Sequence, residues 1–399
     1  MPRLATMDGL EVAGKRVLLR ADLNLPMAAG TVTDTTRIDR LAPTIRELAD
    51  KGARIIVMSH FGRPKGKPDP KASLRPVVPA LEAALDGRKI AFAADCIGPE
   101  AERAAAALEP GEILLLENTR FHKGEEANDP DFVKALVRLG DLYINDAFSV
   151  AHRAHASTEG VARLLPAAAG RAMQRELEAL GLALETPRRP VMAIVGGAKV
   201  STKLDLLANL LAKVDILAIG GAMANTLLAA GGVAVGRSLV EREMIGTARD
   251  FLATAKAKGK PPLLPIDGVV ASALETGVAS ETVAIGGVAA DRMILDIGPA
   301  TVAAIAAKLG NCHTVLWNGP VGAFEVRPFE RGTVELARRV ARLTREAGLI
   351  SIAGGGDTVA ALAAAGVESD LTYVSTAGGA FLEWLEGHKL PGVAVLERA

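Results

Sequence analysis

Short apolar runs alternate with amphipathic helical patterns along the whole chain of 399 residues. The runs are rich in Val, Ile and Leu, which is typical of strands buried on both faces of a sheet. The alternation predicts an α/β protein with mostly parallel sheets and helices on both sheet faces. The predicted strands are residues 16–20, 54–59, 89–94, 113–116, 142–145, 191–195, 216–219, 263–266, 294–297, 314–317, 349–353 and 371–375.

The helical patterns lie between these runs. In 36–51, Ile38, Leu41, Ile45 and Leu48 fall on one face of a helix, and Gly52 ends the pattern. Another helical pattern covers residues 170–184 and is followed by prolines. Since open sheets rarely carry about a dozen strands, we predict two doubly wound domains joined by this helix. The alternative is one more crossover helix within a single sheet.

The predicted boundaries follow from this middle helix. They are an N-terminal domain over 1–169, a connecting helix over 170–185, a C-terminal domain over 186–385 and a tail over 386–399. The tail is apolar enough to dock on another part of the molecule.

The charge balance restricts the classes of partner. Lys and Arg together number 46, as do Asp and Glu, so the net charge is +0. We therefore expect neither general nucleic-acid binding nor binding to acidic membranes. Cys96 and Cys312 are far apart and neither lies in a C-x-x-C motif, which favours a reducing cytosol. No signal-peptide core is visible and no apolar run reaches the roughly 18 residues of a membrane span, so we expect a soluble cytoplasmic protein.

An anion site is predicted at residues 349–362, where an apolar run breaks into three glycines and an Asp-Thr pair opens an alanine-rich segment. The pattern indicates a strand, a glycine turn and a helix N-terminus, whose free N–H groups favour anions. Asp357 could cap this helix or hold Mg²⁺ on bound phosphates. An ordinary strand-to-helix turn is the alternative.

Polar residues follow the apolar runs of the first half, where open α/β sheets bind ligands. Four arginines and a histidine among them could converge on one small polyanion, because guanidinium groups bind phosphate and carboxylate in a bidentate fork. Each taken singly could instead form a surface salt bridge, and we expect His152 and His155 to be structural. The strand-end and helix-start residues are Asp22, Asn24, Arg37, His60, Arg63, Glu117, Asn118, Arg120, Asp146 and Arg153.

The corresponding positions of the second half are glycine-rich, as in Gly196-Gly197-Ala198-Lys199 and 318–322 (NGPVG). They offer backbone N–H groups and apolar surface, which suit a nucleotide. Lys199 and Lys203 would share a face if both were helical, and the alternative is that they are solvated helix lysines. An arginine-rich site in one domain and a nucleotide site in the other favour phosphoryl transfer across a cleft. No Ser-His-Asp or Cys-His nucleophile signature and no zinc-ligand spacing is present in the sequence.

Nine motifs in order show that the chain resembles phosphoglycerate kinases over essentially its whole length. They are 20–26 (RADLNLP), 59–64 (SHFGRP), 116–126 (LENTRFHKGEE), 151–157 (AHRAHAS), 195–200 (VGGAKV), 264–268 (LPIDG), 317–325 (WNGPVGAFE), 354–358 (GGGDT) and 374–392 (VSTAGGAFLEWLEGHKLPG).

The resemblance implies reversible transfer of a phosphoryl group between 1,3-bisphosphoglycerate and MgADP, giving 3-phosphoglycerate and MgATP in glycolysis, with domain closure, by a monomer. It also implies that the tail returns to the N-terminal domain. It assigns the glycerate substrate to Asp22, Asn24, Arg37, His60, Arg63, Arg120 and Arg153. It assigns the nucleotide to Lys203, Asn318, Glu325, Gly355, Gly356, Asp357 and Thr358, with Glu325 on the ribose and Asp357 on Mg²⁺. Arg37 and Lys199 would neutralise the moving phosphoryl group.

Small departures from the family pattern leave these charged groups intact. Ala377 stands where a third glycine is common, Ser149-Val150 replaces the usual Gly-Thr, and Leu23 replaces a frequent Phe. They put local loop geometry in question. Two alternatives stay open: a kinase that forms a different acyl phosphate, and an inert relative that binds nucleotide as a scaffold.

Overall fold

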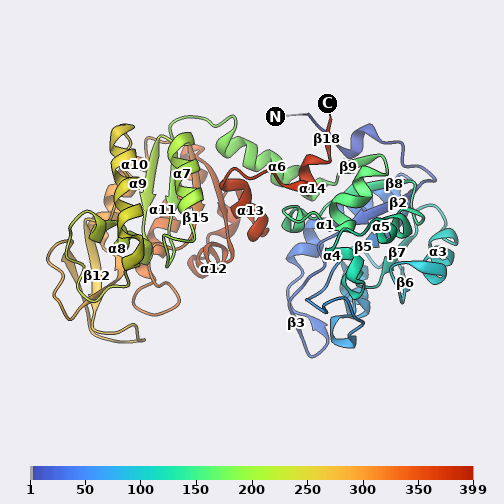
Figure 1. Cartoon of the computed structure of the whole chain (residues 1–399), viewed down its shortest axis with the longest axis horizontal. Helices are drawn as coiled ribbons and strands as arrows, with labels where there is room; N and C mark the ends of the chain where they lie inside the picture. Colours follow the sequence, from blue (N-terminus) through green and yellow to red (C-terminus); the bar gives the residue numbers. More distant parts are fainter. Residues whose placement is uncertain (1–2, 399) are drawn as a thin grey trace. The chain divides into compact units, whose positions relative to one another are not determined.

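The computed structural model describes residues 3–398, which divide into two compact units. Unit 1 contains the residues up to Glu178 together with those from Lys389 onward, and unit 2 is Ala179–His388. One helix, α6 (Arg171–Leu184), contains the residues at which unit 1 ends and unit 2 begins (Figure 1). No helix within residues 3–398 is both long and apolar enough to cross a membrane.

Unit 1 is built on six parallel strands. In sheet order they are β6 (Ile90–Ala93), β7 (Ile113–Leu116), β5 (Arg54–Met58), β2 (Arg16–Arg20), β8 (Leu142–Asn145) and β9 (Ala167–Ala169). Its other helices are α1 (Thr36–Asp50), α2 (Val78–Ala84), α3 (Gly98–Ala106), α4 (Lys123–Glu126), α5 (Pro130–Val137) and α14 (Pro391–Ala394). Two pairs of short strands complete it: β1 (Arg3–Leu4) pairs with β18 (Glu397–Arg398), and β3 (Met27–Ala28) pairs with β4 (Thr31–Val32). Its short helical turns are η1 (Met7–Gly9), η2 (Pro70–Ala72), η3 (Arg75–Val77), η4 (Thr119–Phe121), η5 (Phe148–Val150), η6 (Ala156–Gly160) and η7 (Val161–Arg163).

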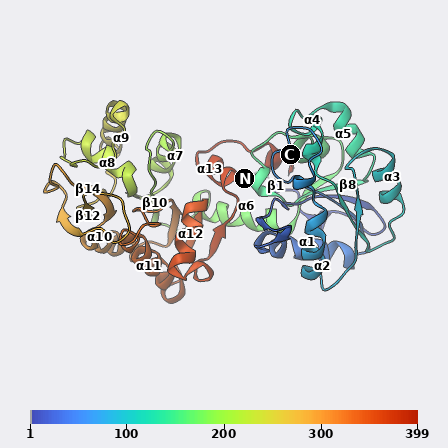
Figure 2. The ribbon, with the colours of Figure 1, turned by 90° about the horizontal axis from the view of Figure 1, so that it is seen from below.

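Both faces of the unit 1 sheet are buried, as the apolar runs predict. Val17 and Leu19 of β2 point into a core under α1 and α2, whereas Leu18 points into the core under α3 and α5. Figure 2 shows α1 and α2 on one side of this unit and α4 and α5 on the other. Because successive side chains of a strand point to opposite faces, both faces of the sheet are apolar and both are covered by helices.

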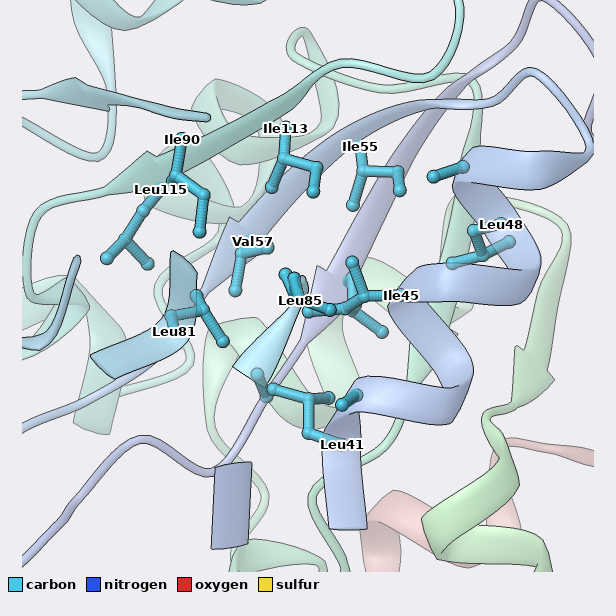
Figure 3. Close-up of a cluster of buried hydrophobic side chains, with 14 of the residues drawn as sticks. Leu41, Ile45, Leu48, Ile55, Val57, Leu81, Leu85, Ile90, Ile113 and Leu115 are labelled. Atoms are coloured by element: carbon cyan, nitrogen blue, oxygen red, sulfur yellow. The ribbon is translucent and has the colours of Figure 1, made fainter. Parts of the chain in front are cut away.

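Helix α1 follows the predicted pattern. Its apolar face packs onto the sheet beside Val57 and Leu81 (Figure 3). Each buried Ile or Leu side chain of this apolar face contributes roughly 1.5–3 kcal/mol to the free energy of folding by leaving water. The helix starts where Asp34 accepts the Thr36 N–H at 2.8 Å, and it ends before Gly52, whose φ of 74° suits glycine. Arg37 is thereby placed in the first turn of α1.

Unit 2 has a five-stranded parallel sheet and a separate three-stranded antiparallel sheet. The parallel strands are, in sheet order, β11 (Ile216–Ile219), β10 (Val191–Val195), β15 (Thr314–Asn318), β16 (Ile350–Gly354) and β17 (Tyr373–Ser375). The antiparallel strands are β13 (Ser280–Ala284), β12 (Asp267–Ala271) and β14 (Met293–Ile297). The helices are α7 (Leu204–Lys213), α8 (Gly221–Ala230), η8 (Arg242–Met244), α9 (Ile245–Ala257), α10 (Pro299–Leu309), α11 (Arg331–Ala347), α12 (Gly356–Ala365), η9 (Glu368–Asp370) and α13 (Gly379–Leu385).

Two strand predictions need correction. Residues 263–266 are not a strand, although Leu263 forms one parallel bridge with Ala218 beside β11. Pro262 and Pro265 flank that bridge and lack the N–H that a continuing ladder requires. The run 294–297 is a strand, but it belongs to the antiparallel sheet as β14.

The C-terminal segment is part of unit 1. Strand β18 pairs antiparallel with β1, and the Gly392 N–H donates to the Ala151 carbonyl at 2.8 Å. Ala5 N–H likewise donates to the Leu396 carbonyl at 2.8 Å. These bonds join the two ends of the described chain within one unit.

Candidate functional site

The polar residues of unit 1 gather at one sheet edge because their strands are neighbours. Strands β7, β5, β2 and β8 lie side by side and are parallel, so their carboxyl ends meet at the same edge. Arg20 ends β2, His60 follows β5, and Arg120 lies in η4 after β7. Arg153 follows β8. The structure thereby brings three arginines to the histidine.

His60 lies in a strongly positive electrostatic environment at this edge of the sheet. Its Nδ1 lies 3.1 Å from Arg20 Nη2, and the guanidinium can only donate, so Nδ1 accepts. Burial, and then the charges of Arg20, Arg120 and Arg153, hold the pKa of His60 well below its usual value. His155 responds in the same way, because burial and the same arginines lower its pKa to about 4. Both imidazoles are therefore neutral at pH 7.

Arg120 has donors that the protein leaves unused. Its side chain is 4% exposed, and Nη1 donates to the Gly62 carbonyl at 2.9 Å. Nε and Nη2 are buried and have no hydrogen-bond partner among residues 3–398, although Nε lies 3.1 Å from Glu126 Oε1. Burial lowers the pKa of this arginine. Buried, unpaired N–H groups in a positive field are suited to an anionic ligand.

Asp22 and Asn24 organise the neighbouring side of the cluster. Arg37 Nη1 donates to Asp22 Oδ1 at 3.1 Å and to the Asn24 carbonyl at 2.8 Å. The Asn24 Oδ1 accepts the Gly62 N–H at 2.9 Å. Ser149 donates to Asp22 Oδ2 at 2.6 Å, so this departure from the family pattern adds a bond to the site. Arg37 is held beside the cluster by these contacts.

Arg63 and Arg153 are less constrained. Arg63 is exposed, and the structure records no hydrogen bond between its side chain and another residue of 3–398. Arg153 is half-buried, with Nε 3.2 Å from His152 Nε2. The interpretation of His155 as structural stays a prediction, although the charges of the arginines reach its ring. Arg20 was missed as a site residue, although its place at a strand end was a usable signal.

In unit 2, Lys203 and Asn318 form one network. Lys203 Nζ donates to Asn318 Oδ1 at 2.6 Å and to the Gly196 carbonyl at 2.8 Å. Asn318 Nδ2 donates to the Gly354 carbonyl at 2.8 Å, at the start of the glycine turn. Burial lowers the pKa of Lys203 to about 8, opposed by the charge of Asp357. The network places a cation next to a helix N-terminus.

The glycine turn has the predicted form. Gly355 is the N-cap of α12, with a φ of 99°, and a Cβ there would lie 2.8 Å from Asn318 Nδ2. Only glycine fits both conditions. Thr358 Oγ1 accepts the Gly319 N–H at 2.7 Å. Asp357 is exposed in the first turn and is not the N-cap, so the interpretation as a cap is wrong.

Glu325 and Asp357 line one pocket of about 490 Å³, which is within the usual size range for a small-molecule site. Glycines 197, 221 and 322 contribute to its wall, as does the exposed apolar side chain of Leu239. The pocket thus has an apolar wall and three carboxyl side chains, since Asp296 lines it as well. The sequence did not identify Leu239, because a single exposed leucine carries no pattern.

Lys199 and Lys203 do not share a helical face. Both precede α7, which begins at Leu204. Lys199 is exposed, whereas Lys203 points into the network described above. Lys199 is therefore accessible to a ligand, whereas Lys203 is held by hydrogen bonds within the protein.

The donor set fits a magnesium ion carried by a nucleotide. Mg²⁺ is usually held by one or two carboxylates, water and substrate phosphates. Asp357 is an exposed carboxylate beside the free N–H groups of α12. A carboxylate and phosphate-binding N–H groups are thereby adjacent.

Comparisons with known proteins identify the family. The family model described as phosphoglycerate kinase matches residues 7–388. A phosphoglycerate kinase of Rhodospirillum centenum is 61% identical over 391 residues, which cover 98% of each chain. One from Chelativorans sp. is 60% identical over 399 residues, covering all of both chains. Among solved structures, phosphoglycerate kinase from Coxiella burnetii has a TM-score of 0.91 at 42% identity and covers 99% of each chain. The chain therefore belongs to the phosphoglycerate kinase family.

Proposed function

We propose that this protein catalyses reversible phosphoryl transfer between 1,3-bisphosphoglycerate and MgADP, giving 3-phosphoglycerate and MgATP. The observation that carries the proposal is the positive cluster around His60, in which Nη2 of buried Arg120 has no hydrogen-bond partner among residues 3–398. Family membership supports the same reaction.

The glycerate substrate binds to unit 1 in this proposal. Its phosphate and carboxylate take the free donors of Arg63, Arg120 and Arg153, because guanidinium groups bind both anions in a bidentate fork. Neutral His60 donates from Nε2, since its Nδ1 accepts from Arg20. Asp22 and Asn24 orient the ligand and Arg37.

The nucleotide binds to unit 2. Gly355, Gly356 and Thr358 present the N-terminus of α12 to the phosphates, and Lys203 with Asn318 supports the turn from below. Glu325 takes the ribose, and Asp357 would hold the Mg²⁺ ion, which would supply positive charge to the phosphates.

The reaction needs no general base, because the attacking oxygen of ADP or of the carboxylate is already ionised. Phosphoryl transfer requires positioning and positive charge around the moving group. Arg37 from the anion site and exposed Lys199 supply that charge. Because the two ligands are bound by different units, closure of the protein is needed to bring them together and exclude water.

We also propose domain boundaries at 1–169, 170–185, 186–385 and 386–399, with a cytoplasmic monomer that binds small molecules and neither nucleic acid nor membranes. The balanced charge supports the absence of nucleic-acid and acidic-membrane partners, since 46 basic and 46 acidic residues leave no net attraction to polyanions.

The test is a coupled assay of ADP formation from MgATP and 3-phosphoglycerate by the purified protein. We expect Mg²⁺-dependent turnover with 3-phosphoglycerate. Turnover with acetate or aspartate alone would indicate a different acyl-phosphate kinase. Binding of MgATP without phosphorylation of any carboxylate would indicate an inert scaffold.

A further inference from the structure

Outside the residues assigned above, unit 1 holds a cluster of three different metal-ligand side chains. Asp95 and Cys96 follow β6, and His122 follows η4. Each offers one ligand atom, and these atoms lie within 4.8 Å of one another. The acid and the histidine are 27 residues apart in the sequence. No short motif could therefore reveal the cluster.

The cluster is held in place by its own contacts. Asp95 Oδ1 accepts the Cys96 N–H at 2.6 Å and lies 2.7 Å from His122 Nε2. The His122 ring packs against Phe132, with ring centroids 5.3 Å apart. For the other Asp95 oxygen the structure records no hydrogen bond within residues 3–398. The side chains are thus ordered, and carboxylate capacity remains.

Access comes from one side. Asp95 and His122 line a pocket of about 700 Å³, together with Asp69 and Ser73. The Asp95 side chain is 46% exposed and the His122 side chain is 30% exposed. Cys96 is fully buried beneath them in the apolar core that also contains Phe132. An ion entering from the pocket would meet oxygen and nitrogen first and sulfur below.

We propose that Asp95, Cys96 and His122 bind a thiophilic divalent cation of the zinc class, with a fourth coordination position open to the pocket. Thiolate and imidazole are ligands that zinc prefers and that Mg²⁺ does not. Zinc lies about 2.0–2.3 Å from such ligands, so ligand atoms up to about 4 Å apart can share one ion. The ligand atoms lie within 4.8 Å of one another, so the side chains rotate closer together when the ion binds in this proposal.

Binding is balanced by proton movements. The Cys96 thiol loses its proton to water and becomes a thiolate ligand. His122 binds through Nε2 while its own proton lies on Nδ1, so the ion replaces the hydrogen bond to Asp95. One proton is released for each ion bound.

The test uses Co²⁺, whose bond to a thiolate produces a near-ultraviolet charge-transfer absorption. We expect this absorption to saturate at one equivalent of Co²⁺ and to be removed by Zn²⁺ but not by Mg²⁺. Cys96→Ser should abolish it, and the matched control Cys312→Ser should retain it, because Cys312 is a buried cysteine in unit 2.

His122→Asn and Asp95→Asn provide a second measurement that spares the buried cysteine. Each should weaken Co²⁺ binding by at least about tenfold while circular dichroism stays unchanged. Absence of the thiolate absorption in the wild type, its survival in Cys96→Ser, or unchanged affinity in both other variants would overturn the proposal. The three residues would then be an ordinary Asp–His hydrogen bond above a core cysteine.

Discussion

Arg120 shows how the anion site is constrained at the scale of single residues. A buried donor without a partner costs about 1–3 kcal/mol, and Nη2 of Arg120 carries such N–H donors among the described residues. The arginine is held in this state by the Gly62 carbonyl and by the nearby Glu126. A ligand that accepts from these donors recovers the cost, so the unliganded site is prepared for an anion.

Lys199→Ala should lower kcat by on the order of 10²-fold, with little change in KM for either substrate. The exposed lysine is free to follow the phosphoryl group, and its charge is most valuable in the transition state. Steady-state kinetics measure this, with Lys258→Ala as the control at an exposed site on the same unit. A change confined to KM would show that Lys199 contributes ground-state binding only.

Asp357→Ala should weaken MgADP binding and raise the Mg²⁺ concentration needed for half-maximal activity. The substitution removes the carboxylate placed beside the N-terminus of α12. Asp131→Ala is the control, because Asp131 is also an exposed acid in the first turn of a helix. An unchanged Mg²⁺ dependence in the Asp357 variant would contradict the metal assignment.

At the scale of elements, the order of strands in each sheet decides which polar residues meet. Apolar runs predicted β2, β7, β8, β10 and β11 with their observed bounds, because these strands are buried on both faces. Strand β13 has mainly exposed residues and no apolar pattern, and it was therefore missed.

The residues of the candidate site were likewise predictable only in part. Residues at strand ends could be predicted from sequence, since position relative to a strand is a local property. The contacts that tune them could not: Arg20 against His60 joins two strands, and Ser149 against Asp22 joins residues far apart in the chain. The geometry of the lysines also depended on where α7 begins.

Asp146 provides a pH test of the contact between β8 and α6. It accepts the Met173 N–H at 2.9 Å, and burial raises its pKa from 3.8 to about 6. Because the folded state binds this proton more tightly than the unfolded state does, the contribution is lost as pH rises from about 4 to 6. Asp146→Asn should therefore reduce the fall in unfolding free energy across this window by at most about 3 kcal/mol.

Urea titrations followed by circular dichroism at several pH values measure this difference. Asp131→Asn, an exposed acid in the same unit, serves as the control and should keep the wild-type pH profile. Identical profiles for wild type and Asp146→Asn would show that Asp146 does not titrate in this range.

At the scale of the whole molecule, the residues proposed to bind the anion belong to unit 1 and those proposed to bind the nucleotide belong to unit 2. The described residues of each unit form their own sheets and cores. In the proposed reaction each unit binds its own ligand, and the two half-sites are separable. Damage to one half-site should therefore spare binding at the other.

Isothermal titration calorimetry with each ligand alone measures whether the two half-sites are separable. Arg63→Ala and Arg120→Ala should each weaken 3-phosphoglycerate binding by roughly 1.5–3 kcal/mol, the usual value of a charge-assisted hydrogen bond, and leave MgADP affinity close to wild type. Glu325→Ala should do the reverse, and Arg103→Ala, an exposed arginine on α3, should change neither. Equal loss of MgADP and 3-phosphoglycerate affinity in folded Arg63→Ala would contradict the assignment of separate half-sites.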